Sequence, residues 1–236
     1  MKATPTRLLR RVFPYLPDWM LSALFPMARI VCSDDTHDPR AFYLEKSFQA
    51  VRHILGDDPG DYLEFGTFYG KSFAMAHLFA RRTGFNKMRF FAFDSFEGFP
   101  HDEGTFRAGH LVVTKKFFSK YIKSRGVDTR RVVITEGIFK DSLTESVKRA
   151  HKLERASVVH FDCDLYESTR DALNFIEDLV QPNTILIFDD WRAYDYLEGP
   201  EKAKAMGQQK AFVEWPLRHR CTEFYEFYQG KAFWMW

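Results

Sequence analysis

Five short apolar runs recur between residues 62 and 188, and longer stretches with helical spacing separate them. The runs cover residues 62–65, 90–93, 131–134, 157–161 and 184–188. Continuous apolar runs of this length suit strands that are buried on both faces, and the intervening helices supply the crossovers that parallel strands need. The pattern therefore predicts an α/β fold with a doubly wound, Rossmann-like, mostly parallel sheet.

The rest of the chain fits one domain built around this sheet. Helices are expected over residues 40–55, 72–82, 115–124, 168–179 and 201–214, and two aromatic strands over 221–227 and 231–236. Gln229-Gly230 between these strands predicts a C-terminal antiparallel hairpin. We expect a single domain over residues 1–236, with a core over 40–236 and a helical extension or lid over 1–35.

Composition narrows the class of protein. Hydrophobic residues make up 45% of the chain and aromatic residues 17%, which excludes disordered and low-complexity classes. A net charge of +2 gives no field that would recruit nucleic acid. Three cysteines without a CxxC pair argue against a disulfide framework and indicate a reducing cytosol.

The N-terminus combines arginine with apolar residues. Pro14, Pro17, Asp18 and Pro26 interrupt its apolar stretch, so we expect neither a signal peptide nor a membrane-spanning helix. Two interpretations stay open: short helices that pack over the domain, or a surface that contacts a membrane or a second subunit.

Glycine and acidic residues lie just after the predicted strands. Ligands of open α/β sheets bind beyond the carboxyl ends of the strands, so these residues would share one edge. The set is Gly66, Thr67 and Ser72 after the first strand, Asp94 and Ser95 after the second, Glu136 and Gly137 after the third, Asp162 and Asp164 after the fourth, and Asp189 and Asp190 after the fifth.

One ligand for this edge is a nucleoside triphosphate. The segment from Gly66 to Ser72 ends in Gly-Lys-Ser, as a phosphate loop does. A phosphate loop needs four residues between its glycines and this segment has three, which changes the backbone N–H groups that can point at phosphates. Glu64 would also repel the phosphates. A nucleotide hydrolase therefore stays an alternative.

S-adenosylmethionine fits the same edge better. Gly66 lets the backbone approach the methionine part, and Ser72 lies near a helix start where it can hydrogen-bond the carboxylate. Asp94 follows the second strand, like the acid that grips a ribose diol in dinucleotide-binding folds. Phe96 and Phe139 are expected to wall the adenine.

Three carboxylates form a second candidate group. Asp162, Asp189 and Asp190 would converge if the fourth and fifth strands are neighbours, and such charges repel one another unless a cation lies among them. Oxygen ligands suit Mg²⁺. The alternative is that Asp189 and Asp190 cap a loop and that Asp164 caps the following helix.

At these residues the chain resembles a known family. In order, it contains LEFGTFYGKS, FAFDSFEGFP, EGIFKDSL, HFDCDLYESTRDAL and ILIFDDW. With these motifs, about residues 40–195 resemble macrocin-type O-methyltransferases. These are metal-dependent class I methyltransferases that act on sugar hydroxyls of macrolide and aminocoumarin antibiotics and of other glycans. A more distant resemblance is to catechol-type O-methyltransferases, which act on small molecules.

The resemblance implies a role for each matching position. Asp162, Asp189 and Asp190 match the Mg²⁺ ligands, and Asp162 also matches the general base. Apart from the resemblance, Asp164 is a second candidate for this base. The resemblance matches Glu64, Gly66, Ser72, Asp94 and Ser95 to the cofactor pocket and puts Gly137 and Phe139 on its adenine side. We expect Thr67, Phe96 and Asp162 to contact the cofactor as well. The chain departs from the usual family pattern at Cys163 and Trp191. The catechol-type catalytic lysine would fall near Leu165, which cannot accept a proton.

Together these features predict Mg²⁺-dependent methyl transfer from S-adenosylmethionine to a hydroxyl with an adjacent oxygen, on a sugar of a small molecule or glycan. We expect a cytoplasmic homo-oligomer whose N-terminus has the composition for peripheral membrane contact. The polar segment 101–114 is expected to be a mobile lid. A non-catalytic cofactor-binding partner protein is a further alternative.

Overall fold

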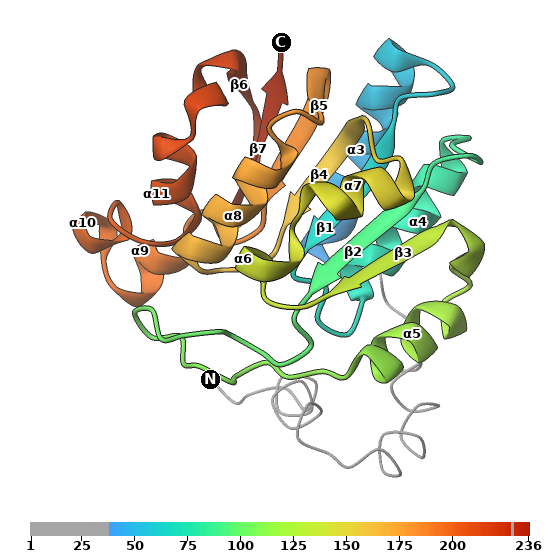
Figure 1. Cartoon of the computed structure of the whole chain (residues 1–236). Coiled ribbons are helices and arrows are strands. Elements are labelled where there is room, and N and C mark those ends of the chain that lie inside the picture. Colours follow the sequence, from blue (N-terminus) through green and yellow to red (C-terminus); the bar gives the residue numbers. More distant parts are fainter. Residues whose placement is uncertain (1–37, 228) are drawn as a thin grey trace.

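The computed structural model describes residues 38–227 and 229–236, and its strands form a seven-stranded sheet (Figure 1). The strand order is β3-β2-β1-β4-β5-β7-β6. The strands are β1 (Asp61–Phe65), β2 (Phe90–Asp94), β3 (Val132–Glu136), β4 (Ala156–Phe161), β5 (Val180–Phe188), β6 (Cys221–Phe227) and β7 (Gly230–Met235). The first five pair in parallel, whereas β7 pairs antiparallel with both β5 and β6. The predicted doubly wound sheet with a C-terminal antiparallel hairpin is confirmed.

Helices connect the strands and cover both faces of the sheet (Figure 1). They are α3 (Pro39–Leu55), α4 (Lys71–Arg82), α5 (Lys115–Ser124), α6 (Phe139–Ser142), α7 (Glu145–His151), α8 (Tyr166–Ile176), α9 (Ala193–Leu197), α10 (Pro200–Ala203) and α11 (Gly207–Glu214), with 3-10 turns at Thr129–Arg131 and Pro216–Arg220. Helices α3, α4 and α5 pack on one face of the sheet, and α8 and α11 pack on the other.

The apolar runs are continuous because the strands contribute side chains to two hydrophobic cores, one on each face of the sheet. Tyr62 of β1 faces the core under α3 and α4, while the next residue, Leu63, faces the core under α8 and α11. Side chains alternate between the faces of a strand, so a strand covered on both faces needs apolar residues at every position.

Local capping fixes the start of α3, which the site uses. The Asp38 carboxylate accepts a hydrogen bond from the Arg40 N–H at 3.0 Å, and proline occupies the first helical position. Both features favour a helix start at this point. The helix ends at Gly56, whose φ is +71°.

The structure corrects one predicted element. The helix expected over residues 201–214 is two helices, α10 and α11, separated by residues 204–206. Gly207 has a φ of +57°, and a Cβ there would lie 2.4 Å from the ring of Tyr194. The chain therefore bends where only glycine fits against α9, and residue periodicity gives no sign of that contact.

The expected N-terminal extension over residues 1–35 lies outside the described residues. Within residues 38–227 and 229–236, no helix has the length and apolar character needed to cross a membrane.

Candidate active site

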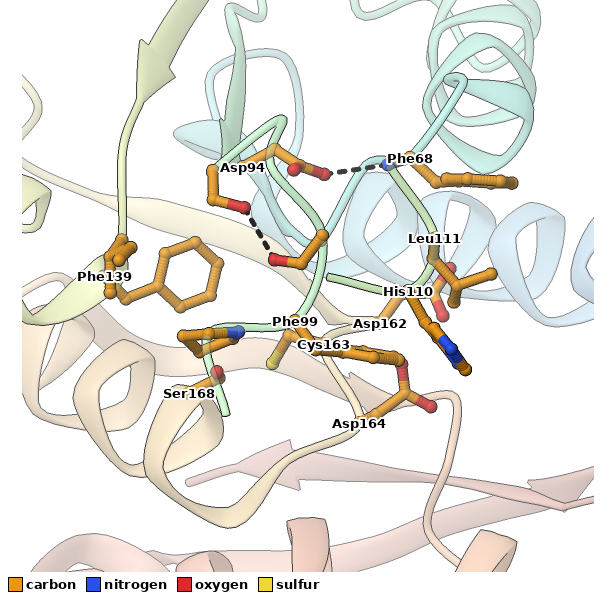
Figure 2. A pocket seen from close by; sticks show the side chains of 15 residues that line it. Phe68, Asp94, Phe99, His110, Leu111, Phe139, Asp162, Cys163, Asp164 and Ser168 are labelled. Carbon is orange, nitrogen blue, oxygen red and sulfur yellow. Dashed lines mark hydrogen bonds between the residues drawn. The ribbon is translucent and has the colours of Figure 1, made fainter. Parts of the chain in front are cut away.

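The strand order changes direction between β1 and β4: β2 and β3 lie on one side of β1, and β4 and β5 lie on the other. The carboxyl ends of β2, β1, β4 and β5 share one edge of the sheet at this point. Open α/β sheets bind their ligands at such a switch point. A pocket opens there (Figure 2). It is lined by Gly66, Phe68, Asp94, Ser95, Gly98, Phe99, Pro100, His110, Leu111, Ile138, Phe139, Asp162, Cys163, Asp164 and Ser168.

The turn after β1 is tied to the end of β2 by the Asp94 carboxylate. Its Oδ2 accepts hydrogen bonds from the N–H groups of Thr67 at 2.7 Å and Phe68 at 2.9 Å, and its Oδ1 accepts one from Phe96 at 2.8 Å. Burial raises the pKa of Asp94, although these backbone hydrogen bonds oppose the shift. The residue predicted to bind a ribose therefore also shapes the pocket wall, as Figure 2 shows.

Glu64 and Ser72 lie behind the turn. Glu64 is fully buried, and its Oε1 accepts a hydrogen bond from the Ser72 hydroxyl at 2.7 Å. This bond joins the end of β1 to the first turn of α4. The hydroxyl hydrogen of Ser72 is thus committed to Glu64 instead of the predicted ligand carboxylate.

The Gly-Lys-Ser segment does not act here as a phosphate loop would. The Lys71 ammonium group is buried, and its Nζ lies 2.5 Å from Asp38 Oδ2. A phosphate loop uses its lysine to reach the phosphates. In this structure the lysine instead anchors α3 to α4.

Only some of the residues predicted to surround the adenine line the pocket. Phe139 and Ser95 line the pocket, and the Ser95 hydroxyl donates to Gly98 O at 2.9 Å. The Phe96 ring instead packs in the core against Phe118, with ring centroids 5.7 Å apart. Gly137 donates its N–H to Asp94 O at 3.0 Å and supports the wall from behind. An adenine in this pocket would meet Phe139 rather than Phe96.

Asp162 follows β4, and Asp189 and Asp190 follow β5; these three carboxylates form the acidic edge of the sheet. Three side chains lie close together there. Ligand atoms of His160, Asp162 and Asp189 all lie within 4.8 Å of one another. Two of these residues, Asp162 and Asp189, belong to the predicted metal trio. Asp190, the third, turns toward the hairpin between β6 and β7: its Oδ1 accepts a hydrogen bond from Gln229 Nε2 at 3.0 Å, and its buried Oδ2 has no hydrogen-bond partner among the described residues.

Positive and hydrogen-bonding groups from elsewhere balance these carboxylates. Arg40 of α3 places Nη1 3.6 Å from Asp162 Oδ2, and the Tyr43 hydroxyl donates to Asp189. His160 lies between Asp189, 3.7 Å from its Nε2, and Glu64, 3.6 Å from its Nδ1. Sequence reasoning missed all three groups. Only His160 left a local signal, because it precedes Asp162 by two residues and so extends along the same face of the chain.

The pKa values of the carboxylates at this edge shift in opposite directions. Burial raises the pKa of Asp162 and of Asp190 well above the ordinary range, and neighbouring carboxylates add to the effect. Burial acts the same way on Asp189, but His160 and Arg40 outweigh it and lower the pKa of Asp189. Burial would lower the pKa of His160, but the neighbouring carboxylates of Asp189 and Glu64 raise it to about 10. The raised pKa values of Asp162 and Asp190 thus report burial and repulsion among neighbouring carboxylates, a repulsion that a bound cation would relieve.

This edge fits a hard divalent cation. Asp162 and Asp189 offer carboxylate oxygens beside a ring nitrogen of His160, and the buried Asp190 Oδ2 has no hydrogen-bond partner within the described part of the chain. A buried, unpaired carboxylate oxygen is costly unless a ligand satisfies it, and oxygen donors suit Mg²⁺. Asp162 and Asp189 would hold such an ion, whereas Asp190, bonded to Gln229 and outside the close group, stays a predicted third ligand.

Two carboxylates face the pocket as candidate proton acceptors. Figure 2 shows Asp162 and Asp164 on the opposite side of the pocket from Phe139. Burial and the neighbouring Asp162 raise the pKa of Asp164 to about 8. A base with a pKa near neutrality suits proton transfer at neutral pH.

The loop between β2 and α5 closes one side of the pocket. Phe99, His110 and Leu111 of this loop line it. Glu103 fastens the loop, because its carboxylate accepts hydrogen bonds from the Tyr166 N–H at 2.9 Å and the Gly207 N–H at 2.7 Å. These are the first residues of α8 and α11, so one carboxylate caps two helices. The mobility predicted for segment 101–114 stays a prediction.

Known proteins resemble the chain in sequence and in fold. A family model described as macrocin-O-methyltransferase (TylF) matches residues 42–217. A Streptomyces olivaceus enzyme, 8-demethyl-8-(2,3-dimethoxy-alpha-L-rhamnosyl)-tetracenomycin-C 4'-O-methyltransferase, is 30% identical over 157 residues. That match covers 60% of this chain and 57% of the enzyme, so the chain spans little more than half of the relative's length.

Solved structures share the fold. The O-methyltransferase NovP has a TM-score of 0.61 at 22% identity, covering 82% of this chain and 78% of NovP. The calicheamicin methyltransferase CalS11 has a TM-score of 0.68 at 18% identity, covering 100% of this chain and 95% of CalS11. An O-methyltransferase from Bacillus cereus in complex with SAH has a TM-score of 0.55 at 16% identity, covering 97% and 94%.

Proposed function

The chain belongs to the macrocin-O-methyltransferase (TylF) family, and on that premise we propose that it is an S-adenosylmethionine- and Mg²⁺-dependent O-methyltransferase of sugar hydroxyls. One observation carries the proposal. Asp162 both lines the pocket and belongs to the close acidic group, so a donor in the pocket and a cation at the edge would meet at one residue.

The pocket suits the methyl donor by shape and by charge. Gly66 and the backbone of the turn after β1 would face the methionine part, and Asp94 would face the ribose. Phe139 offers a ring for the adenine. The acidic edge favours a positive sulfonium, because carboxylates stabilise a nearby cation.

The acidic edge supports the proposed dependence on Mg²⁺. When bound, a divalent cation lowers the pKa of a coordinated hydroxyl and fixes its oxygen. Asp162, Asp189 and Asp190 would hold the ion, and Asp164, with a pKa of about 8, is placed to accept the hydroxyl proton. Asp162 is the second candidate for this base. Positioning of the acceptor beside the donor supplies much of the remaining rate.

The acceptor we propose is a sugar with a neighbouring oxygen, on a small molecule or a glycan. The Streptomyces olivaceus relative, whose name describes a rhamnosyl substrate, supports this class. The family's biosynthetic role supports a cytoplasmic location. We further propose that the protein is a homo-oligomer.

Replacement of Asp189 tests the function. Asp189→Ala should abolish Mg²⁺-dependent methyl transfer to a rhamnose-bearing acceptor, while S-adenosylhomocysteine still binds within a few-fold of the wild-type affinity by calorimetry. Asp58→Ala is the control, because its side chain is 85% exposed at the opposite end of the sheet. Full activity of Asp189→Ala in excess chelator would exclude the metal mechanism.

Thermal stabilisation separates the alternatives, since a ligand that binds only the native state raises its stability. We expect S-adenosylhomocysteine, but not ADP with Mg²⁺, to raise the melting temperature. The opposite result would favour a nucleotide hydrolase. Stabilisation by S-adenosylhomocysteine without turnover across a wide acceptor panel would favour a non-catalytic partner protein.

A further inference from the structure

A buried glutamine in α11 bridges the two strand ends that bear the acidic edge. Gln208 is 1% exposed. Its Nε2 donates a hydrogen bond to Phe161 O at 3.0 Å, and its Oε1 accepts one from the Asp190 N–H at 3.1 Å. Phe161 directly precedes Asp162, so one planar amide joins the backbone at both carboxylate-bearing segments.

The bridge begins where the sheet ends. The β4–β5 register closes with Phe161 opposite Phe188, and the last backbone bond between the strands runs from the Asp189 N–H to Phe161 O at 2.9 Å. Beyond this point the two segments diverge into loops, and the Gln208 amide continues the ladder by one more rung. Gln229 adds to it by donating to the Asp190 carboxylate at 3.0 Å.

Packing alone gives no reason for a glutamine at this position. The next inward-facing residues of α11, Ala211 and Phe212, are apolar and belong to the core. A buried amide costs free energy unless its donor and its acceptor are both satisfied. Here each is satisfied by the backbone of a candidate metal-binding segment.

We propose that Gln208 is a positioning residue that sets the separation between Asp162 and the Asp189–Asp190 pair, and thereby the affinity of the edge for a divalent cation. The proposal rests on the metal-dependent function proposed above. Groups that orient metal ligands typically contribute about 10- to 100-fold to metal affinity or activity. A glutamine supplies both a donor and an acceptor at the required reach, whereas methionine supplies neither and asparagine is one methylene shorter.

The test measures Mn²⁺ binding by electron paramagnetic resonance in the full-length chain. Gln208→Met and Gln208→Asn should weaken Mn²⁺ binding about 10- to 100-fold. Their affinity for S-adenosylhomocysteine should stay within about 3-fold of wild type, since the bridge touches the acidic edge and not the adenine side of the pocket. The Mg²⁺ concentration for half-maximal activity should rise, while kcat at saturating Mg²⁺ is largely restored. If Gln208 had only a structural role, its variants would be less stable, and saturating Mg²⁺ would not restore kcat.

Gln181→Met is the matched control. The Gln181 amide also donates to a backbone carbonyl, Pro59 O at 2.7 Å, but at the opposite end of the sheet. It should leave Mn²⁺ affinity unchanged. Wild-type Mn²⁺ affinity in either Gln208 variant would overturn the positioning role alone. A wild-type protein that binds no Mn²⁺ would overturn the metal-dependent function as well, so the two failures are distinguishable. If Gln208→Met does not fold, Gln208→Asn decides.

Discussion

Gly66 lies so close to Asp162 that a Cβ at Gly66 would stand 2.1 Å from the Asp162 carbonyl oxygen. The turn after β1 and the turn after β4 therefore touch through their backbones at the mouth of the pocket. Gly66 also has a φ of +84°, which side chains rarely adopt. Two separate constraints thus require glycine at this position.

Gly66→Ala should destabilise the fold by more than backbone strain alone. Gly126 has a similar φ of +78° with open space around it, so Gly126→Ala serves as the control. We expect Gly126→Ala to lower the free energy of unfolding by about 1–2 kcal/mol. Gly66→Ala should cost a further 1–3 kcal/mol, roughly, from the clash. Urea denaturation measures both, and equal losses would contradict the close contact.

Asp190→Asn should act in opposite directions with and without metal. In EDTA, the substitution removes a buried carboxylate oxygen that has no hydrogen-bond partner among residues 38–227 and 229–236 and lies among other carboxylates, so stability should rise by about 1 kcal/mol. In Mg²⁺, wild type should gain stability and the variant should gain much less. Melting curves in both buffers test this, with Asp58→Asn as control. A variant that is less stable in EDTA would refute the repulsion argument.

Glu103→Ala should release the loop that closes the pocket. The substitution removes the acceptor for the Tyr166 and Gly207 N–H groups, and such caps contribute about 0.5–2 kcal/mol. Trypsin should then cut faster after the exposed Arg107. Glu97→Ala is the control, because Glu97 is an exposed carboxylate of the same loop. Equal cleavage rates in both variants would show that Glu103 does not hold the loop.

His77 should make stability fall in mild acid. Its Nε2 faces the Asp128 N–H at 3.2 Å and Arg131 Nη2 at 2.8 Å, so folding favours the neutral ring. Burial, and then Arg131, lower the pKa of His77 from 6.5 to about 4. The unfolded chain therefore binds more protons between these values, and the free energy of unfolding should fall by about 1–3 kcal/mol as pH drops through this window.

His77→Gln isolates this contribution, because an amide oxygen can accept the same hydrogen bonds without titrating. Urea denaturation at several pH values between 7 and 4 should give a flatter profile for the variant than for wild type. Parallel profiles would assign the acid sensitivity to other groups.

The strands were predictable because their signal is local. Each apolar run is short and bounded by turn residues. The ends of the predicted strands agree with the observed strand ends to within two residues, except that β5 begins earlier, at Val180. The edge that gathers Gly66, Asp94, Asp162 and Asp189 was also predictable, because parallel strands bring their carboxyl ends together. The break before Gly207 was not, because it depends on contact with Tyr194.

Side-chain directions at the site escaped prediction for a similar reason. Asp189 and Asp190 are adjacent in sequence, yet one joins His160 and Asp162 while the other turns to Gln229. Phe96 adopts a φ of +57° and packs into the core instead of the pocket. Such directions are set by loop backbone angles, which long-range packing fixes.

The sequence alone determined the class of fold, the order of strands and helices, and the edge at which glycine and acidic residues collect. Those features follow from periodicity, caps and turns, which act over a few residues. Only the tertiary structure decided which groups surround the carboxylates. Arg40, Tyr43 and Gln208 come from helices far away along the chain, and they reach the site because two cores hold α3 and α11 against opposite faces of one sheet.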